Sequence, residues 1–183
     1  MLHYKTTMKY SEESIRALCQ TQYSVYDGWK ATLLILLCIA GMSLAVTTKL
    51  SQVGTVLVIG VCGICVSLAT YPPKYKAKAT ISAMNGVFPE TEYFFFEDDI
   101  LLKSGSGEKR EDYSIFERLQ HDEKFIYLFI SKTQAYILDK QRILPSDPDG
   151  LLGFLAQKTG KRVYRSRGGS KLGLRTLLFG TKR

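Results

Sequence analysis

Two cysteines, Cys62 and Cys65, have the spacing that redox pairs and zinc half-sites use. Both lie in residues 50–73, a run without any charged side chain, and the chain has no second pair that would complete a metal site. The thiolate that either chemistry needs is strongly disfavoured in apolar surroundings. We therefore expect these cysteines, and Cys38 in the neighbouring apolar run, to be small packing side chains.

Carboxylates and histidines supply two further sets of groups that could act as metal ligands or acid–base catalysts. Glu97–Asp99 stands between two strand-like runs, where adjacent carboxylates usually form a polar turn. The run His121–Glu123 contains one of the two histidines of the chain. An enzyme built on either set is one hypothesis, but no spacing in the sequence resembles a nucleophile elbow or a metalloprotease helix.

Glycines 105 and 107 are the remaining chemical signal, because glycine-rich loops can cradle a phosphate group. A phosphate loop ends in Lys followed by Ser or Thr and continues into a helix, whereas this run has strand-like residues on both sides. The plain interpretation is a β-hairpin turn. We therefore predict that the protein is not an enzyme and has no catalytic residues, no metal site and no cofactor.

The elements that would position these residues are indicated by an uneven distribution of charge. The 183 residues include 25 Lys and Arg against 17 Asp and Glu, a net charge of +8. Residues 31–71 contain a single charged side chain, Lys49, whereas residues 158–183 contain nine basic side chains and no acidic one. This distribution excludes a uniformly basic nucleic-acid binder. It also excludes a simple soluble globule, because the nearly uncharged run has no face that water would solvate.

Two uncharged runs, residues 31–48 and 50–73, are long enough to cross a membrane as helices. About 20 apolar residues span the roughly 30 Å hydrocarbon core of a bilayer. We therefore predict a two-helix transmembrane hairpin over residues 31–73. Only Lys49 lies in its turn, so the basic flanks place both termini in the cytoplasm of a multi-pass cell-membrane protein. Those flanks carry Lys5, Lys9, Arg16, Lys30, Lys74, Lys76 and Lys78.

Small residues recur on the second predicted helix at Gly60, Gly63 and Ser67, where they let another helix approach closely. We favour packing against the first helix of the same hairpin, near Gly41, over dimerisation. The run Tyr71–Pro73 is expected to end the second helix. Neither apolar run contains Asp, Glu, Lys, Arg or His, which favours an anchor over a transport pathway.

The segments outside the hairpin predict a mixed domain. Residues 1–30 contain a strand-like run and a helix capped by Ser11. Residues 74–160 contain short aromatic and β-branched runs with the short connections of antiparallel strands, then a helix between Asp147 and Gly160. We predict an α+β fold, with an antiparallel sheet of about five to seven strands forming a partly closed, pleckstrin-homology-like barrel under a C-terminal helix. Whether the N-terminal strand joins the sheet stays open.

Two runs in the second half of the chain resemble the YcxB-like family of bacterial membrane proteins. The first is Tyr93–Ile100 followed by Tyr113–Ile115, and the second is Tyr127–Lys140, the more recognisable one. The similarity covers about residues 90–158 and departs at 138–140, where the family usually has Ile-Pro-Lys. The resemblance implies two membrane helices, a cytoplasmic pleckstrin-homology-like domain and no established activity, so no catalytic residue is carried over. The basic end of the chain lies outside it.

The resembling stretch contains one polar turn, Ser131–Gln134, for which a binding role is a hypothesis. Residues 161–183 form a basic tail, for which we consider a solvated tail, contact with anionic lipids, and contact with nucleic acid. A basic side chain near an anionic leaflet contributes about 1 kcal/mol. Nucleic acid is disfavoured because no reading helix or base-stacking platform is evident. The candidate lipid- or partner-binding residues are Lys161, Arg162, Arg165, Arg167, Lys171 and Arg175.

These patterns favour a non-enzymatic integral membrane protein of unknown specific role, whose cytoplasmic domain binds a protein partner or the anionic membrane surface. The alternative is an accessory or immunity-type regulatory subunit of a larger membrane complex, such as a transporter. That subunit would dock on a membrane-protein partner, or on a second copy of itself, through Gly60, Gly63 and Ser67.

Overall fold

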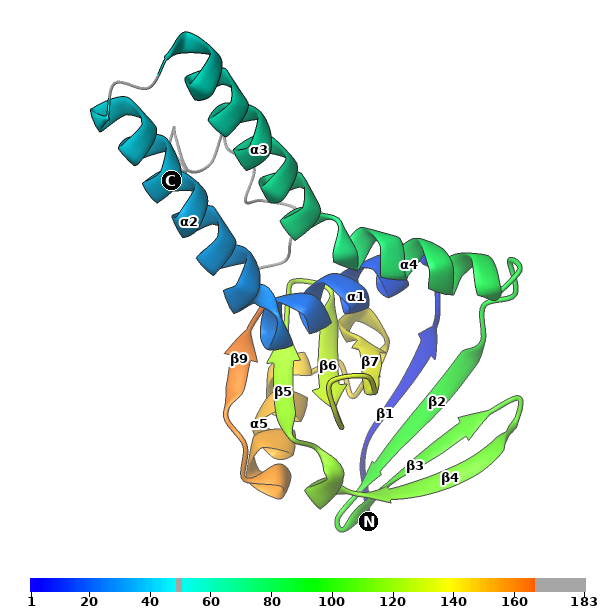
Figure 1. The fold of residues 1–183 in the computed structure, drawn as a ribbon. Coiled ribbons are helices and arrows are strands. Elements are labelled where there is room, and N and C mark those ends of the chain that lie inside the picture. The colour runs from blue at the N-terminus through cyan, green and yellow to red at the C-terminus, as the bar shows by residue number, and fades with distance from the viewer. Residues whose placement is uncertain (49–50, 167–183) are drawn as a thin grey trace.

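The computed structural model of the protein describes residues 1–48 and 51–166 (Figure 1). The helices are α1 (Glu12–Tyr26), α2 (Gly28–Thr47), α3 (Gln52–Thr70), α4 (Pro72–Ala83) and α5 (Pro148–Thr159), with two short 3-10 helices, η1 (Tyr113–Ile115) and η2 (Lys140–Arg142). The strands are β1 (Leu2–Lys9), β2 (Glu90–Phe96), β3 (Asp99–Ser104), β4 (Gly107–Asp112), β5 (Arg118–His121), β6 (Phe125–Phe129), β7 (Ala135–Asp139), β8 (Ile143–Leu144) and β9 (Val163–Arg165). Together they form the α+β fold that the sequence predicts.

The strands form two sheets rather than the single sheet expected from the sequence. The larger sheet has the order β4-β3-β2-β1-β8 and is antiparallel throughout. The smaller sheet has the order β7-β6-β5-β9, in which β5 and β9 run parallel. The N-terminal strand β1 therefore lies inside the larger sheet, between β2 and β8. Residues on both sides of the two apolar helices thus build one sheet.

The core of the domain follows from the period of the strands. Along β2 the side chains of Tyr93 and Phe95 are buried, while the residues between them are half-buried on the opposite face. Strand β6 is a continuous apolar run and is buried along its whole length. Phe95 of the larger sheet meets Phe116 and Phe129 in one cluster, where each of the three is 0% exposed. The aromatic residues that suggest strands in the sequence are therefore also the ones that hold the two sheets together.

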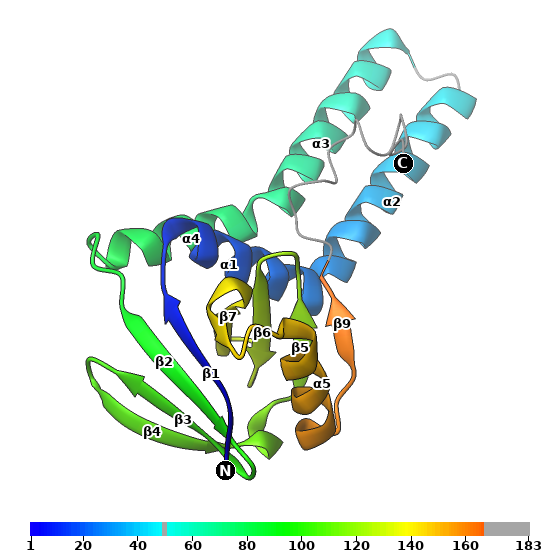
Figure 2. The same cartoon turned by 180° about the vertical axis from the view of Figure 1, so that it is seen from behind.

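Helix α1 begins at a capping box and lies with α4 along the end of the domain from which α2 and α3 project (Figures 1 and 2). The Ser11 hydroxyl accepts a hydrogen bond from the Ser14 backbone N–H at 3.2 Å, and the Ser14 hydroxyl accepts one from the Ser11 N–H at 2.9 Å. One turn later, Ile15 and Cys19 are buried against Ala77 of α4. This contact joins the segment before the apolar helices to the segment after them.

Helices α2 and α3 run side by side and project away from the sheets (Figure 1). By length and composition α2 is suited to cross a membrane. The stretch Gln52–Ser67 of α3 passes the same test together with α4, from which it is bent by 41°. The two helices meet at a pair of cysteines, where the Cys62 thiol lies 3.7 Å from the Cys38 carbonyl oxygen. Both cysteines thus take part in packing between the helices.

The small residues of α3 do not pack against α2, so the interpretation that we favour from the sequence is wrong. A Cβ atom added at Gly60 or Gly63 would meet no atom within 4 Å, and the same holds at Gly41 of α2. Ser67 is exposed as well. The physical reason is the rotation of α3, which turns Cys62 toward α2 and leaves the small residues on its outer surface.

The end of the second apolar helix near Tyr71 agrees only in part with the prediction from the sequence. Helix α3 ends at Thr70, as the run Tyr71–Pro73 predicts, but a new helix, α4, begins at Pro72. Proline is well suited to the first position of a helix, because the N–H that it lacks has no partner there anyway. The two prolines therefore end one helix and start the next. Pro73 and Ala77 face inward, so α4 is part of the domain.

The C-terminal helix α5 follows the prediction closely. The Asp147 carboxylate accepts a hydrogen bond from the Gly150 N–H at 2.8 Å, and Gly160 ends the helix with a left-handed φ of 65°. The helix lies beside β5 in both views (Figures 1 and 2) and buries Leu151 and Leu155 in the core. The chain then forms β9, parallel to β5. Residues 163–165 therefore belong to the smaller sheet, although the sequence assigns them to a basic tail.

Truncation of a buried side chain in β1 tests whether this strand is part of the cooperative fold. Met8 is 1% exposed, so Met8→Ala should lower the free energy of unfolding by about 2–5 kcal/mol through lost contacts and a residual cavity. Urea unfolding of the full chain in detergent, followed by the near-ultraviolet circular dichroism of its tyrosines, measures the change. The exposed neighbour provides the control, since Lys9→Ala should cost less than about 0.5 kcal/mol. Equal effects of the two substitutions would contradict the placement of β1.

Candidate functional site

The carboxylates at residues 97–99 form a turn whose charges are paired. Glu97 contacts Lys158 of α5 and lies 2.6 Å from the imidazole of His3 in β1. These two hydrogen bonds, that of Lys158 first, hold the pKa of Glu97 below its ordinary value. Asp99 pairs with Arg110 of β4 at 2.8 Å. The polar turn that the sequence predicts thus ties α5 to the larger sheet and adds side-chain contacts from its strands β1 and β4.

The run His121–Glu123 lies where β5 turns into β6, and Asp122 organises that turn. Its carboxylate accepts hydrogen bonds from the backbone N–H groups of Lys124 at 2.8 Å and Phe125 at 2.7 Å. It also accepts one from the Tyr127 hydroxyl at 2.6 Å. Burial, and then this hydrogen bond to Asp122, raise the pKa of the Tyr127 hydroxyl. The carboxylate is therefore occupied in shaping the β5–β6 connection.

His121 lies among cationic groups on the smaller sheet. Its Nδ1 atom is 2.9 Å from Nζ of Lys140, whose ammonium also donates to the Asp122 carbonyl oxygen at 2.5 Å. Burial, followed by the charges of Lys140 and Arg165, lowers the pKa of His121 below its ordinary value of 6.5. Burial also lowers the pKa of Lys140. The neutral imidazole is therefore the form that the folded domain favours.

The cysteines are free thiols in packed positions. Cys38 and Cys62 face each other across α2 and α3, and Cys65 is half-buried one turn further along α3. Cys19 lies between α1 and α4, where burial raises the pKa of its thiol. A raised pKa disfavours the reactive thiolate.

The basic residues proposed from the sequence as lipid or partner contacts fall into two groups. Lys161, Arg162 and Arg165 are exposed in and before β9. Arg167, Lys171 and Arg175 lie outside the described residues. The described chain ends at Ser166, whose hydroxyl is 3.3 Å from the Thr21 hydroxyl of α1. The last described residue therefore lies beside α1, the helix that leads into α2.

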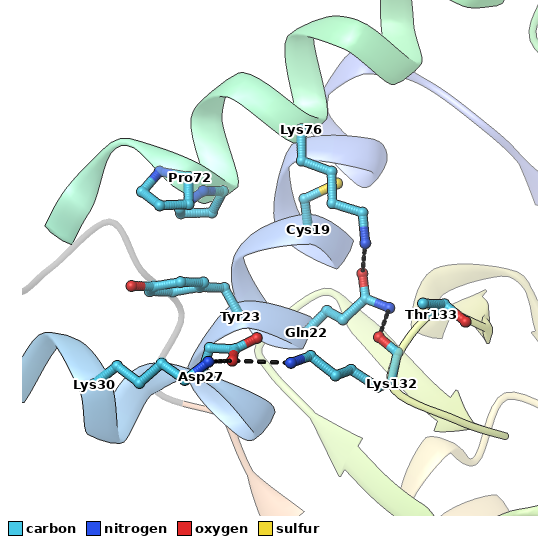
Figure 3. A pocket seen from close by; sticks show the side chains of 10 residues that line it. Cys19, Gln22, Tyr23, Asp27, Lys30, Pro72, Lys76, Lys132 and Thr133 are labelled. Atoms are coloured by element: carbon cyan, nitrogen blue, oxygen red, sulfur yellow. Dashed lines mark hydrogen bonds and ion pairs between the residues drawn. The ribbon is translucent and has the colours of Figure 1, made fainter. Parts of the chain in front are cut away.

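A cavity of about 460 Å³ lies where α2 and α3 meet the domain (Figure 3). It is enclosed by α1, the first turn of α2, the start of α4 and the turn between β6 and β7. We call it the junction cavity. Its polar walls are Gln22, Tyr23, Asp27, Lys30, Lys76 and Lys132.

Gln22 is the central polar group of the junction cavity. It is 7% exposed, and both ends of its amide are used. The amide nitrogen donates to the Lys132 carbonyl oxygen at 2.5 Å, and the amide oxygen accepts from the Lys76 ammonium at 2.7 Å. One buried side chain thus fixes α4 and the β6–β7 turn relative to α1.

Asp27 connects the remaining two lysines of the junction cavity. One of its oxygens, Oδ1, lies 2.8 Å from Nζ of Lys30 and 2.9 Å from Nζ of Lys132. The hydrogen bond from Lys30, followed by that from Lys132, lowers the pKa of Asp27, so the group is a carboxylate at neutral pH. The cavity therefore holds three ammonium groups against one carboxylate.

A second cavity of about 470 Å³ provides a comparison of similar size. It lies at the other end of α1, between the β1–α1 connection and η2. Its charged walls are Lys9, Glu12, Glu13, Lys124, Asp139 and Arg142. Positive and negative groups are equal in number there, so of these two cavities in the described part of the chain the junction cavity is the one with an excess of one charge.

The sequence indicates part of the junction cavity. It points to the turn Ser131–Gln134 as a possible binding element and to Lys30 and Lys76 as basic flanks of the apolar runs. It gives no sign of Gln22 or Asp27 as partners of that turn. The nearest signal is Asp27 itself, an acidic residue four positions before the first apolar run and three positions before Lys30.

Residues 95–155, from β2 into α5, match the family model described as YcxB-like protein. This stretch of the chain is YcxB-like. The match confirms the resemblance that the sequence suggests over residues 90–158. The YcxB-like segment supplies the Lys132 turn of the junction cavity, whereas α1, α2 and α4 lie outside it. Searches of curated proteins and of solved structures found no match to the chain.

The environment of His121 predicts a pH dependence of stability. Because its pKa is lower in the folded chain than the ordinary 6.5, protonation favours the unfolded state. Well above pH 6.5 the imidazole is neutral in both states and does not reduce the stability of the fold. As the pH falls from about 6.5 through the lower folded pKa, protonation of the unfolded chain lowers the free energy of unfolding. Urea unfolding at pH 7 and pH 5 should therefore show a larger loss for the native chain than for His121→Gln.

Lys109→Gln, on β4, supplies the control for this measurement. It should keep the native difference between pH 7 and pH 5, because His121 and its neighbours Lys140 and Arg165 are unchanged. If His121→Gln loses as much stability as the native chain over this interval, the assignment of the pH dependence to His121 is wrong.

Proposed function

We propose that the protein is a non-enzymatic integral membrane protein. In this proposal α2 and α3 cross the membrane as a hairpin, and the two-sheet domain lies against the cytoplasmic leaflet, where it engages anionic lipid headgroups. The domain corresponds to a pleckstrin-homology-like scaffold, supported by its antiparallel sheets, their shared core and the C-terminal helix. The basic C-terminal residues contribute electrostatic attraction.

The observation that carries the proposal is the exposure of apolar side chains on α2 and α3 away from the contact between the two helices. Leu36 and Leu37 are consecutive residues of α2, so they point in directions about 100° apart, yet they are 58% and 60% exposed. On α3, Leu57 and Ile59 are 64% and 56% exposed. A soluble protein rarely exposes a continuous apolar surface of this kind, whereas hydrocarbon solvates it well.

Aromatic and basic residues change the character of both helices where they reach the domain. Trp29, at the start of α2, is 63% exposed and precedes Lys30. At the end of α3, the rings of Tyr71 and Tyr75 lie 6.1 Å apart, followed by the lysines of α4. Trp and Tyr favour the membrane–water interface, and basic residues gather on the cytoplasmic side. This distribution supports a membrane boundary at the level of the junction cavity, with the domain in the cytoplasm.

The position of the basic C-terminal segment supports contact with anionic lipids. Residues 158–183 carry nine basic and no acidic side chains. The described part of that segment ends at Ser166 beside Thr21 of α1, on the side of the domain that the hairpin leaves. An anionic leaflet attracts basic residues only within about a Debye length, roughly 8 Å at physiological salt. Ser166, beside α1, would lie close to the surface that attracts these basic residues.

Docking of a partner helix on α3 is the second candidate. The specific observation in its favour is that Gly60 and Gly63 lie on the outer surface of the hairpin with open space around them. Small residues on an outward face let a second helix approach closely in a membrane. An accessory or immunity-type subunit of a larger membrane complex, or a homodimer, would use this face.

Membrane integration is tested by extraction with alkaline carbonate. The native chain should stay in the membrane pellet, since the hydrophobic hairpin is held by the bilayer. An arginine at the centre of a membrane helix costs about 3 kcal/mol of insertion free energy. Leu37→Arg combined with Ile59→Arg should therefore shift the chain toward the soluble fraction. Ser106→Arg, in the β3–β4 turn, adds the same charge to the domain and should leave the distribution unchanged. A native chain that is extracted by carbonate would refute the proposal.

The orientation of the hairpin is tested by labelling single cysteines in intact cells. The four native cysteines are replaced by alanine, and Ser51→Cys or Ser106→Cys is added to that background. A membrane-impermeant maleimide should label Ser51→Cys, in the connection between α2 and α3, from outside the cell. Ser106→Cys should react only after the cells are broken, because the domain is cytoplasmic. The opposite pattern would place the domain outside.

A further inference from the structure

We propose that the junction cavity binds the phosphate group of an anionic membrane lipid. The inference rests on the proposed function, because a membrane hairpin that ends at α1 and α4 places this cavity at the depth of the lipid headgroups. The same chemistry would suit a soluble phosphate compound, and the experiment below separates the two sources.

The charge of the junction cavity selects an anion. Lys30 of α2, Lys76 of α4 and the turn residue Lys132 bring three ammonium groups to it, against the single carboxylate of Asp27. Lysine binds phosphate as a compact charge with several donors, which does not require one fixed geometry. A phosphate group would offset the positive excess that Asp27 leaves.

The lysines are positioned before any ligand arrives. Figure 3 shows Lys76 reaching from α4 to Gln22, while Lys30 and Lys132 converge on Asp27 from opposite sides. Within the described part of the chain, Lys76 forms no ion pair and is held by the neutral amide of Gln22 alone. An anion at Lys76 therefore gains a charge-assisted hydrogen bond without displacing a carboxylate. Preorganisation of this kind lowers the entropic cost of binding.

The remaining wall suits the uncharged part of a lipid headgroup. Tyr23 and Pro72 lie between α1 and the start of α4, on the side of the cavity away from Lys132 (Figure 3). Ligand sites of about 300–1,000 Å³ commonly combine apolar walls with a few placed polar groups, and this cavity of about 460 Å³ falls within that range. The three lysines would thus contact the charged group of a phosphate ester, while Pro72 and the ring of Tyr23 would contact the carbon atoms next to it.

The exposed ring of Trp29 gives an independent indication of depth. It precedes Lys30 in the first turn of α2 and is 63% exposed, although tryptophan is usually highly buried. An interfacial tryptophan sits at the level of the headgroups in a bilayer. The lysine next to it would then meet phosphate groups directly.

The test uses the full-length protein in a nonionic detergent and isothermal titration calorimetry. The probes are dioctanoyl phosphatidylglycerol, dioctanoyl phosphatidylcholine and sn-glycerol 3-phosphate. Phosphatidylglycerol should bind at one saturable site, at least about tenfold more tightly than the other two. Lys132→Gln and Lys76→Gln each remove a charge-assisted hydrogen bond and should weaken that binding about tenfold or more. Both side chains are exposed, so these variants keep the fold, which near-ultraviolet circular dichroism verifies.

A matched control separates the cavity from general attraction between charges. Lys109→Gln, on β4 and paired with Glu111, removes the same charge far from the hairpin and should leave the affinity within about twofold. Equal affinity of the native chain and both cavity variants, or equal loss in Lys109→Gln, would overturn the proposal. So would phosphatidylcholine binding as tightly as phosphatidylglycerol.

Two other outcomes show which part of the proposal has failed. If sn-glycerol 3-phosphate binds as tightly as phosphatidylglycerol and Lys132→Gln weakens both, the phosphate site stands and the lipid source is overturned. Carbonate extraction and cysteine labelling do not depend on these lysines. Loss of specific binding in a chain that is still integrated therefore overturns the cavity proposal alone, and leaves the proposed membrane function intact.

Discussion

The pairing of β1 with β2 is the contact on which the rest of the structure depends. It joins residues 2–9 to residues 90–96 with Thr6 opposite Tyr93, and everything between them is a long insertion into one sheet. Closing such a loop costs conformational entropy, which the buried contacts of β1 must offset. Once closed, the loop brings α1 and α4 side by side, where Ile15 meets Ala77. The base of the apolar hairpin is thereby fixed to the domain at both ends, and the junction cavity lies between them.

Much of the local structure is predictable because its causes are local. The Ser11 capping box, the alternation along β2 and the left-handed Gly160 act within a few residues, and each produces the expected element. The elements that are missed have no local signal of sufficient length. β8 and β9 have two and three residues, too short to display a period of two. Helix α4 is hidden by Tyr71–Pro73, which marks a break without indicating that a new helix follows it.

The candidate site is less predictable, because its contacts join distant parts of the chain. Gln22 bonds to a residue 110 positions away, and Asp27 pairs with one 105 positions away, both of them Lys132. In the sequence, the charge of Lys30 is already explained by the basic flanks that orient a membrane hairpin, so it does not identify a cavity. The position of Gly63 on the outer surface of the hairpin is not predictable either, because it depends on packing between α2 and α3. Small residues indicate that a helix can be approached closely, but the rotation of α3 is fixed by packing at Cys62.

The proposed function and the proposed phosphate site imply two kinds of electrostatic attachment, which differ in range. Exposed basic residues such as Lys161 and Arg162 attract an anionic surface over about a Debye length, so salt weakens their contribution steeply. A phosphate in direct contact with the ammonium groups of the junction cavity would lie well within that distance, so salt would weaken its binding less. The first kind responds to the charge density of the leaflet, whereas the second can distinguish one headgroup from another. Both would require a fixed depth, which a membrane-spanning hairpin would provide. The apolar helices would thus do more than hold the domain at the membrane, because they set the height at which Lys132 and its neighbours meet the lipid phosphates.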